Sequence, residues 1–155
     1  MQVDPTTLVF FDASCLVAAA GRPVGGAGYV LSLCARDLLR AVVSHPVLVE
    51  AERNIRAHFP DATLTTYHEW LARSGAMVVA VPALTARSSY RELVGEKDEH
   101  VFAAAVAAGA PFLLSLDRPL VRGVNEANLP IRALSPGEFI NDVLPKHVDA
   151  QSLRE

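Results

Sequence analysis

Short apolar runs that alternate with helix-forming segments constrain the fold of this chain most strongly. Four runs have the continuous apolar character of strands buried on both faces, which is typical of parallel sheets. They cover residues 8–11, 40–44, 77–81 and 112–116, and a shorter run at 131–134 predicts a fifth strand. This alternation predicts an α/β fold of three layers, with helices on both faces of a central, mostly parallel sheet of four or five strands.

The segments between these strands predict helices and a few irregular stretches. We expect helices at 14–20, 29–39, 46–58, 65–73, 100–108 and 137–144. The glycine-rich segment 21–28 predicts a flexible loop, and the polar segment 82–97 predicts irregular structure. The length of 155 residues favours a single domain over residues 1–145, and the polar tail 146–155 is expected to fray.

Four acidic residues stand where an apolar strand ends or where the next helix begins. Asp12 and Asp117 follow strands directly, whereas Glu50 and Asp98 lie near the starts of helices. Right-handed crossovers bring the carboxyl ends of parallel strands to one edge of the sheet, and such folds place their sites there. We therefore expect these four carboxylates to meet in one acidic pocket.

Four carboxylates at one edge repel one another and lose contact with water. A hard divalent cation relieves both costs, and Mg²⁺ and Mn²⁺ accept oxygen ligands of this kind. The acidic residues thus indicate a metal-dependent enzyme that acts on a phosphodiester, with one or two bound ions. The number of ions stays open.

Each acidic residue also has a plainer interpretation, and two of them have rivals. Taken alone, Asp98 would be a helix cap and Asp117 a turn residue. Glu52 competes with Glu50, since two positions along a helix change the face that a side chain occupies. Two further acids compete with Asp98, namely Glu96 and Glu99.

Composition neither excludes a nucleic-acid substrate nor supports one. The net charge is −3, but without the four acidic residues 14 basic residues stand against 13 acidic ones. Cys15 and Cys34 lie in apolar stretches and are expected to be buried thiols, which fits a reducing cytoplasm. No targeting segment is visible, and the longest apolar run of 16 residues is short for a membrane span.

These motifs, in this order, resemble the PIN domain, a nuclease fold that includes the toxins of VapBC-type toxin–antitoxin pairs. The resemblance covers 8–144. FFDAS matches the first motif with Asp12 and Ser14, and Glu50 matches the acid early in the helix after the second strand. Asp98 opens an alanine-rich helix, and SLD after the next strand supplies Ser115 and Asp117.

The resemblance implies an endoribonuclease that hydrolyses single-stranded RNA with Mg²⁺ or Mn²⁺. Asp12 and Asp117 are then the best direct ligands, Asp98 binds directly or through water, and Glu50 orients the attacking water or binds a second ion. Two serines would hold the carboxylates in place, Ser14 and Ser115. The resemblance also implies that the protein binds a cognate antitoxin protein and that it forms a homodimer.

Three arginines are candidates for contacts with RNA phosphates, because arginine suits phosphate recognition. They are Arg22, Arg118 and Arg122.

Two other classes of protein remain open. Phosphatases that resemble haloacid dehalogenases also place an aspartate after their first strand. They need a second aspartate two residues later, where this chain has Ser14, and a lysine in the later half, where it offers Lys97 and Lys146. A non-catalytic PIN scaffold that binds RNA or protein is the other alternative.

Overall fold

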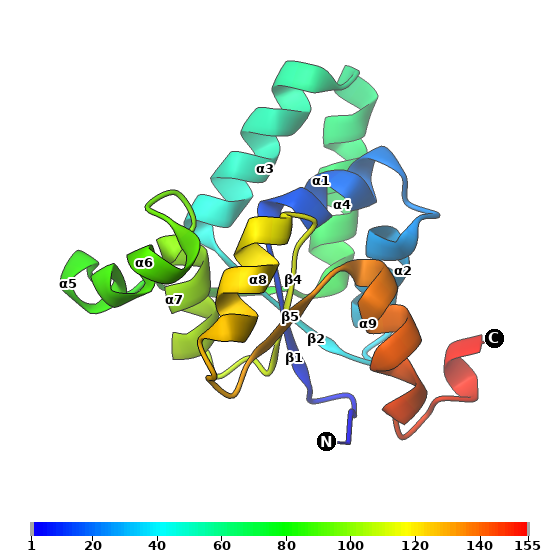
Figure 1. The fold of residues 1–155 in the computed structure, drawn as a ribbon. Helices are drawn as coiled ribbons and strands as arrows, with labels where there is room; N and C mark the ends of the chain where they lie inside the picture. The colour runs from blue at the N-terminus through cyan, green and yellow to red at the C-terminus, as the bar shows by residue number, and fades with distance from the viewer. Residues whose placement is uncertain (1, 155) are drawn as a thin grey trace.

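The computed structural model describes residues 2–154 and shows a five-stranded sheet with helices on both faces (Figure 1). The strands are all parallel and lie in the order β3-β2-β1-β4-β5. They are β1 (Leu8–Phe11), β2 (Arg40–Ser44), β3 (Met77–Val79), β4 (Phe112–Leu114) and β5 (Arg132–Leu134). The predicted three-layer α/β fold is therefore confirmed.

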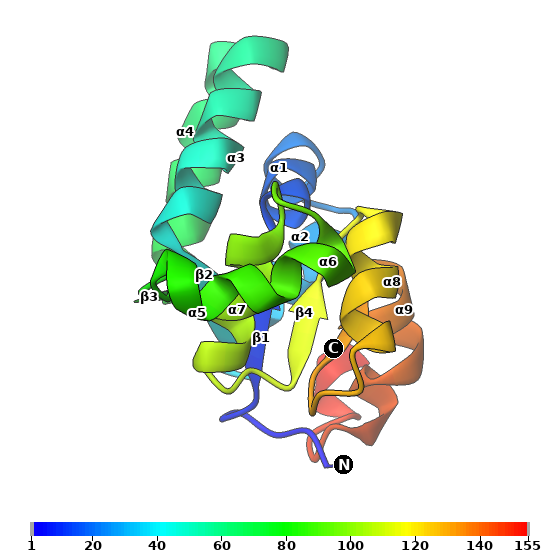
Figure 2. The same ribbon diagram turned by 60° about the vertical axis from the view of Figure 1, so that its left-hand side comes forward.

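The helices divide between the two faces as right-handed crossovers require. From β1 the chain moves outward to β2 and β3, and the connecting helices α1 to α4 pack together on one face of the sheet. The chain then crosses back to β4 and β5, and α5 to α8 lie on the other face (Figures 1 and 2). The helices are α1 (Ala13–Gly21), α2 (Gly26–Ala35), α3 (His45–His58), α4 (Asp61–Ser74), α5 (Leu84–Arg87), α6 (Arg91–Val94), α7 (Glu99–Ala107), α8 (Arg118–Glu126) and α9 (Pro136–Asp142). Short 3-10 turns are η1 (Ser88–Tyr90), η2 (Leu144–Lys146) and η3 (Ser152–Arg154).

The two central strands form the middle of the core. Phe10 and Leu113 are fully buried, because β1 and β4 have helices over both faces and neighbouring strands on both sides. Cys15 and Cys34 are buried free thiols, as expected from their apolar surroundings. The apolar runs at 8–11 and 112–116 thus mark strands that lie deep in the sheet. The run at 77–81 instead forms the edge strand β3, where Met77 and Val78 are exposed.

The strand order reverses direction between β1 and β4. The chain leaves β1 toward one side of the sheet and leaves β4 toward the other, so the connections diverge at the carboxyl ends of these two strands. Open α/β sheets bind ligands at such a point, where diverging connections leave a crevice. Here the Asp12 N–H donates to the Leu114 carbonyl at 3.0 Å and holds the two strand ends together.

The glycine-rich segment is partly helical, contrary to the expected loop. Helix α2 begins at Gly26 and includes Gly28. A Cβ atom on Gly28 would lie 2.0 Å from the Pro23 carbonyl oxygen, so only glycine allows this approach of the helix to the preceding turn.

Two further segments are more regular than the sequence pattern predicts. The polar stretch 82–97 contains α5, η1 and α6, where irregular structure was expected. After Asp117 the chain forms α8, a helix that the pattern did not predict, with Pro119 in its first turn. Proline is tolerated there because the first helical N–H groups have no partner within the helix.

The expectation of a frayed tail is wrong for the residues that the structure describes. His147 and Leu153 are buried, and the Tyr29 hydroxyl donates to the Leu153 carbonyl at 2.6 Å. The Val148 N–H donates to the Val3 carbonyl at 2.9 Å, which ties the tail to the start of the chain. The tail therefore packs against the domain, because α2 offers it tertiary partners that are distant in sequence.

Candidate active site

Asp12 lies at the carboxyl end of β1, and its carboxylate is held by three hydrogen bonds. The Ala13 N–H donates to Oδ1 at 2.8 Å. The hydroxyls of Ser14 and Ser115 donate to Oδ2 at 3.1 and 2.7 Å. The residue is only 6% exposed, so these contacts fix the orientation of a nearly buried charge.

The same two hydroxyls bind the backbone that follows β4. The Asp117 N–H donates to Ser115 Oγ at 3.0 Å, and the Leu116 N–H donates to Ser14 Oγ at 3.0 Å. Asp117 is the N-cap of α8 and accepts from the Leu120 N–H at 3.3 Å. The serines thereby couple the position of Asp12 to that of Asp117 across the two central strands.

Asp98 occupies the N-cap position of α7, but its side chain makes no capping hydrogen bond. Burial raises the pKa of Asp98 to about 6. The negative charges of Asp117 and Asp12 contribute to this rise, as does that of Glu50 to a smaller extent, whereas the positive charge of Lys97 opposes it. Asp12, Asp117 and Glu50 therefore lie within electrostatic range of Asp98.

The rivals of Glu50 and Asp98 point elsewhere. Glu52 pairs with Arg56 at 2.8 Å on the same helix, on a partly exposed surface. Glu99 is buried and pairs with Arg91 at 2.9 Å and, more loosely, with Arg87 at 3.6 Å. Glu96 is exposed to solvent. The geometry thus favours Glu50 and Asp98 as the members of the acidic group.

The ion pairs of Glu99 are a feature that sequence reasoning missed. They attach the segment of α5 and α6 to the start of α7, next to the acidic group. Arg87 ends α5 and Arg91 begins α6, so two separate short helices bring the guanidinium groups to Glu99. The sequence gives no clear signal for these pairs, because the segment 82–97 has no helical pattern.

The donor set at this edge fits a hard divalent cation. All four predicted ligands are carboxylates, the type of group that Mg²⁺ and Mn²⁺ prefer. The Ser44 hydroxyl at the end of β2 is also buried and has no hydrogen-bond partner within residues 2–154. Continuing the pairing of β1 with β2 by two residues sets Ser44 beside Asp12, so an ion or water at this edge would meet an unpaired hydroxyl.

The acids do not form a complete ligand set. Within the described part of the chain, no three histidine, cysteine or acidic side chains lie close enough together to hold a metal ion. Carboxylate repulsion, which contributes to the raised pKa of Asp98, opposes closer approach.

Two of the three predicted phosphate contacts share one hollow. Arg22 and Arg118 line a hollow of about 440 Å³ that also borders Leu116, next to Asp117. Arg118 pairs with Glu138 at 3.0 Å, on an exposed surface where such a pair is weak. Arg122 is exposed on α8 and does not line this hollow.

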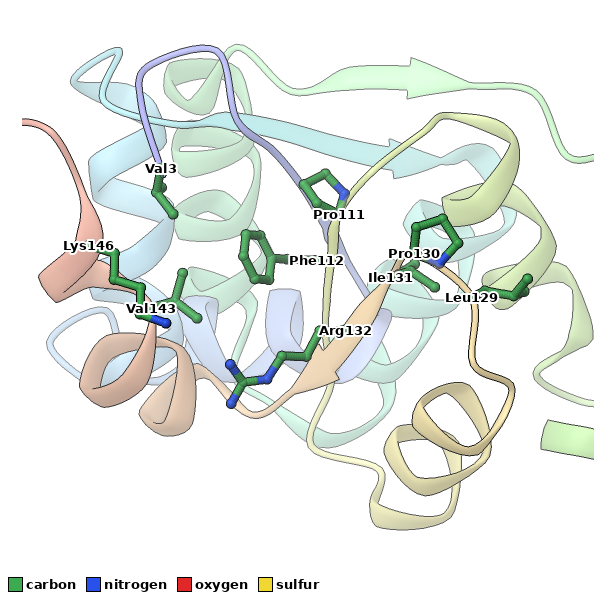
Figure 3. Close-up of a pocket in the computed structure, with 9 residues that line it drawn as sticks. All are labelled: Val3, Pro111, Phe112, Leu129, Pro130, Ile131, Arg132, Val143 and Lys146. Atoms are coloured by element: carbon green, nitrogen blue, oxygen red, sulfur yellow. The ribbon is translucent and has the colours of Figure 1, made fainter. Parts of the chain in front are cut away.

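A separate hollow lies at the opposite edge of the sheet. Figure 3 shows its lining around Phe112 and Arg132, at the amino ends of β4 and β5, with Val3 and Lys146 nearby. Its volume is about 360 Å³ and its walls are mainly apolar, with no acidic residue among those that line it. It therefore plays no part in the acidic group at the carboxyl edge.

Comparison with solved structures identifies similar folds. PAE2754 from Pyrobaculum aerophilum matches with a TM-score of 0.58 and 21% identity, over 82% of this chain and 83% of that one. VapBC2 from Rickettsia felis, bound to a DNA fragment from its promoter, matches with a TM-score of 0.59 and 14% identity. The match covers 83% of this chain and 98% of that one. VapC20 from Mycobacterium tuberculosis, a toxin that cleaves the sarcin–ricin loop, matches with a TM-score of 0.55 and 17% identity. The match covers 80% of this chain and 98% of that one.

The chain therefore has the PIN-domain, VapC-like fold that its motifs resemble. No protein-family profile and no curated protein matches the sequence. Within residues 2–154, none of the helices combines the length and the apolar character that crossing a membrane requires.

Proposed function

We propose that this protein is a Mg²⁺- or Mn²⁺-dependent endoribonuclease that hydrolyses phosphodiester bonds of single-stranded RNA. The observation that carries the proposal is that Ser14 and Ser115 join the Asp12 carboxylate to the backbone at Leu116 and Asp117, at the point where the strand order reverses, with Asp98 nearby. The PIN-domain fold, and the likeness to VapC20, a toxin that cleaves the sarcin–ricin loop, support it.

The carboxylates have distinct roles in this proposal. Asp12 and Asp117 would hold the ion directly, and Asp98 would do so directly or through water. A bound divalent ion supplies Lewis acidity for phosphodiester hydrolysis. Glu50 would orient the attacking water or hold a second ion.

The serines act through the acids. Ser14 and Ser115 each donate to Asp12 Oδ2 and accept a backbone N–H from the segment after β4. They therefore keep Asp12 in place relative to Asp117, as partners of metal ligands commonly do. The arginine-lined hollow beside Leu116 offers the RNA strand a positively charged approach.

We also propose that the protein is the toxin of a toxin–antitoxin pair in the cytoplasm, acting as a homodimer and inhibited by a cognate antitoxin. The likeness to VapBC2 supports this part of the proposal. A small antitoxin gene next to its own, together with growth arrest when the protein is induced alone, would be the expected observations.

The phosphatase alternative is disfavoured by the site. The position that would need a second aspartate is Ser14, whose hydroxyl donates to Asp12. Of the late lysines, Lys146 lies at the opposite edge of the sheet, and only Lys97 is near the acids.

Cleavage of labelled single-stranded RNA, with and without EDTA, tests the proposed function. We expect cleavage by the wild-type protein, none in EDTA, and none by the Asp12→Asn and Asp117→Asn variants, with the fold checked by circular dichroism. Activity retained in either variant would reject the site, and the absence of cleavage together with intact RNA binding would favour the non-catalytic scaffold.

A further inference from the structure

A third hollow opens beside Glu50, on the other side of the acidic group from the arginine-lined hollow. It measures about 410 Å³ and lies between the first turns of α3 and the start of α7. The residues that line it are Pro46, Val49, Glu50, Arg53, Lys97 and His100. It therefore combines one acid of the candidate site with two permanent cations and a histidine.

Electrostatic coupling joins this hollow to the acidic group. Lys97 precedes Asp98, and its positive charge opposes the rise in the pKa of Asp98. Burial lowers the pKa of His100, and the charges of Glu50 and Asp12 act on it in the opposite direction. Lys97 and His100, at the α7 side of the hollow, are thus close to the carboxylates, and Glu50 itself lines the α3 side. A molecule in the hollow would therefore lie next to the candidate site.

The two permanent cations of the hollow are available to a ligand. Arg53 and Lys97 are exposed, and neither takes part in an ion pair within residues 2–154. Arg56, which is close to Arg53 on the same helix, instead pairs with Glu52. The cations therefore face the hollow without a fixed partner, while the nearby acids would repel an anion that lacked positive contacts.

We propose that this hollow receives an RNA phosphate adjacent to the one that is cleaved, with Arg53 and Lys97 as its contacts. The strand would then cross the carboxyl edge from the hollow of Arg22 and Arg118 to the hollow of Glu50. This inference rests on the proposed ribonuclease function, and it adds a binding subsite and a path for the substrate.

The geometry favours an unpaired strand over a small anion. Cations lie in hollows on both sides of the acids, so successive phosphates of one chain can be neutralised while the scissile phosphate lies over the carboxylates. Pro46 and Val49 add apolar surface that can contact a ribose or base, which a free phosphate would leave unused. Backbone contacts of this kind make binding dependent on salt.

The test measures how RNA binding depends on salt. A fluorescein-labelled oligouridylate is titrated by anisotropy at several NaCl concentrations, in an Asp12→Asn background so that the probe is not cut. We expect Arg53→Ala/Lys97→Ala to reduce the magnitude of the slope of log K against log[NaCl] by about 0.7, since the two cations share one phosphate and each phosphate contact on a single strand contributes about 0.7. Affinity at low salt should fall several-fold.

The matched control is Arg56→Ala/Lys146→Ala, which also removes two positive charges, but at positions outside the hollow. Arg56 pairs with Glu52, and Lys146 lies at the opposite edge of the sheet (Figure 3). We expect its slope to equal that of the parent. An equal loss of slope in the two double variants would reveal a general charge effect and would overturn the inference.

Steady-state cleavage separates this inference from the proposed function. In the otherwise wild-type protein, Arg53→Ala/Lys97→Ala should raise KM for a long single strand and leave kcat within about twofold. Cleavage by the wild type, with an unchanged KM and slope in the double variant, would overturn the subsite and leave the ribonuclease proposal standing. A lower kcat alone would show that these cations act on the acids and would also overturn it. If the wild type cleaves no RNA, the proposed function itself fails.

Discussion

Replacing Asp98 by asparagine should stabilise the metal-free protein near neutral pH. The pKa of Asp98 rises from its ordinary value of 3.8 to about 6, first through burial and then through the charges of Asp117 and Asp12. The ionised carboxylate is therefore less favourable in the folded state than in the unfolded chain. The amide of asparagine has nearly the same shape and carries no charge.

The size and the pH range of this effect follow from the pKa. Each pKa unit corresponds to about 1.36 kcal/mol, which sets an upper limit of about 3 kcal/mol. Because Asp98 is only partly buried, solvent screening reduces the expected gain to about 1–2 kcal/mol. The stabilising contribution of protonated Asp98 is fully present below pH 3.8, the ordinary pKa of an aspartate, and is lost as the pH rises through about 6. The advantage of the variant should therefore appear above that range and vanish at acidic pH.

Urea unfolding of the wild type and of Asp98→Asn, in EDTA and across the acidic to neutral range, measures this difference. Unfolding midpoints give the change in stability if the slope m stays constant. A variant that is destabilised at neutral pH, or whose advantage does not depend on pH, would refute the electrostatic account.

Three further substitutions test contacts that shape the site. Ser115→Ala removes a hydroxyl that donates to Asp12 and accepts a backbone N–H, so urea unfolding should show a loss of about 1–3 kcal/mol. Glu99→Ala leaves Arg91 and Arg87 without their shared carboxylate partner and should lower stability in the same assay. Gly28→Ala forces a Cβ to within 2.0 Å of a backbone carbonyl, and overpacking of this kind should lower stability by about 3 kcal/mol, visible as a lower thermal midpoint.

Each of these substitutions has a matched control in the chain. Ser115→Thr keeps a hydroxyl and should preserve most of the stability. Glu52→Ala breaks an exposed pair and should cost less than about 1 kcal/mol. Gly137→Ala meets nothing closer than 3.9 Å and should be tolerated. Equal effects in a variant and its control would contradict the corresponding contact.

The central strands could be predicted from the sequence, because burial on both faces leaves a continuous apolar run. The runs at 8–11 and 40–44 coincide with β1 and β2. Helix α8 escaped prediction because it starts with Arg118–Pro119, a dipeptide that equally suits a turn. The packing of the tail could not be predicted from the sequence either, since Leu153 contacts Tyr29 only through tertiary structure.

The members of the acidic group could be proposed from their places at strand ends and helix starts. The choice between Glu50 and Glu52 needed the structure, because both lie within one turn of α3 and both are half-buried. Their faces became distinct only once Arg56 and His68 were placed beside Glu52. The role of Glu99 likewise depends on Arg91, which reaches it from a segment without a clear pattern.

Calorimetric titration with Mn²⁺ tests most directly whether the acids at the carboxyl edge share a divalent ion. The wild type should bind Mn²⁺ with measurable heat, and Asp12→Asn/Asp117→Asn should lose that binding while remaining folded by circular dichroism. Glu52→Gln, which changes an acid outside the group, should bind like the wild type. Absence of binding to the wild type, or equal binding by the double variant, would contradict the account.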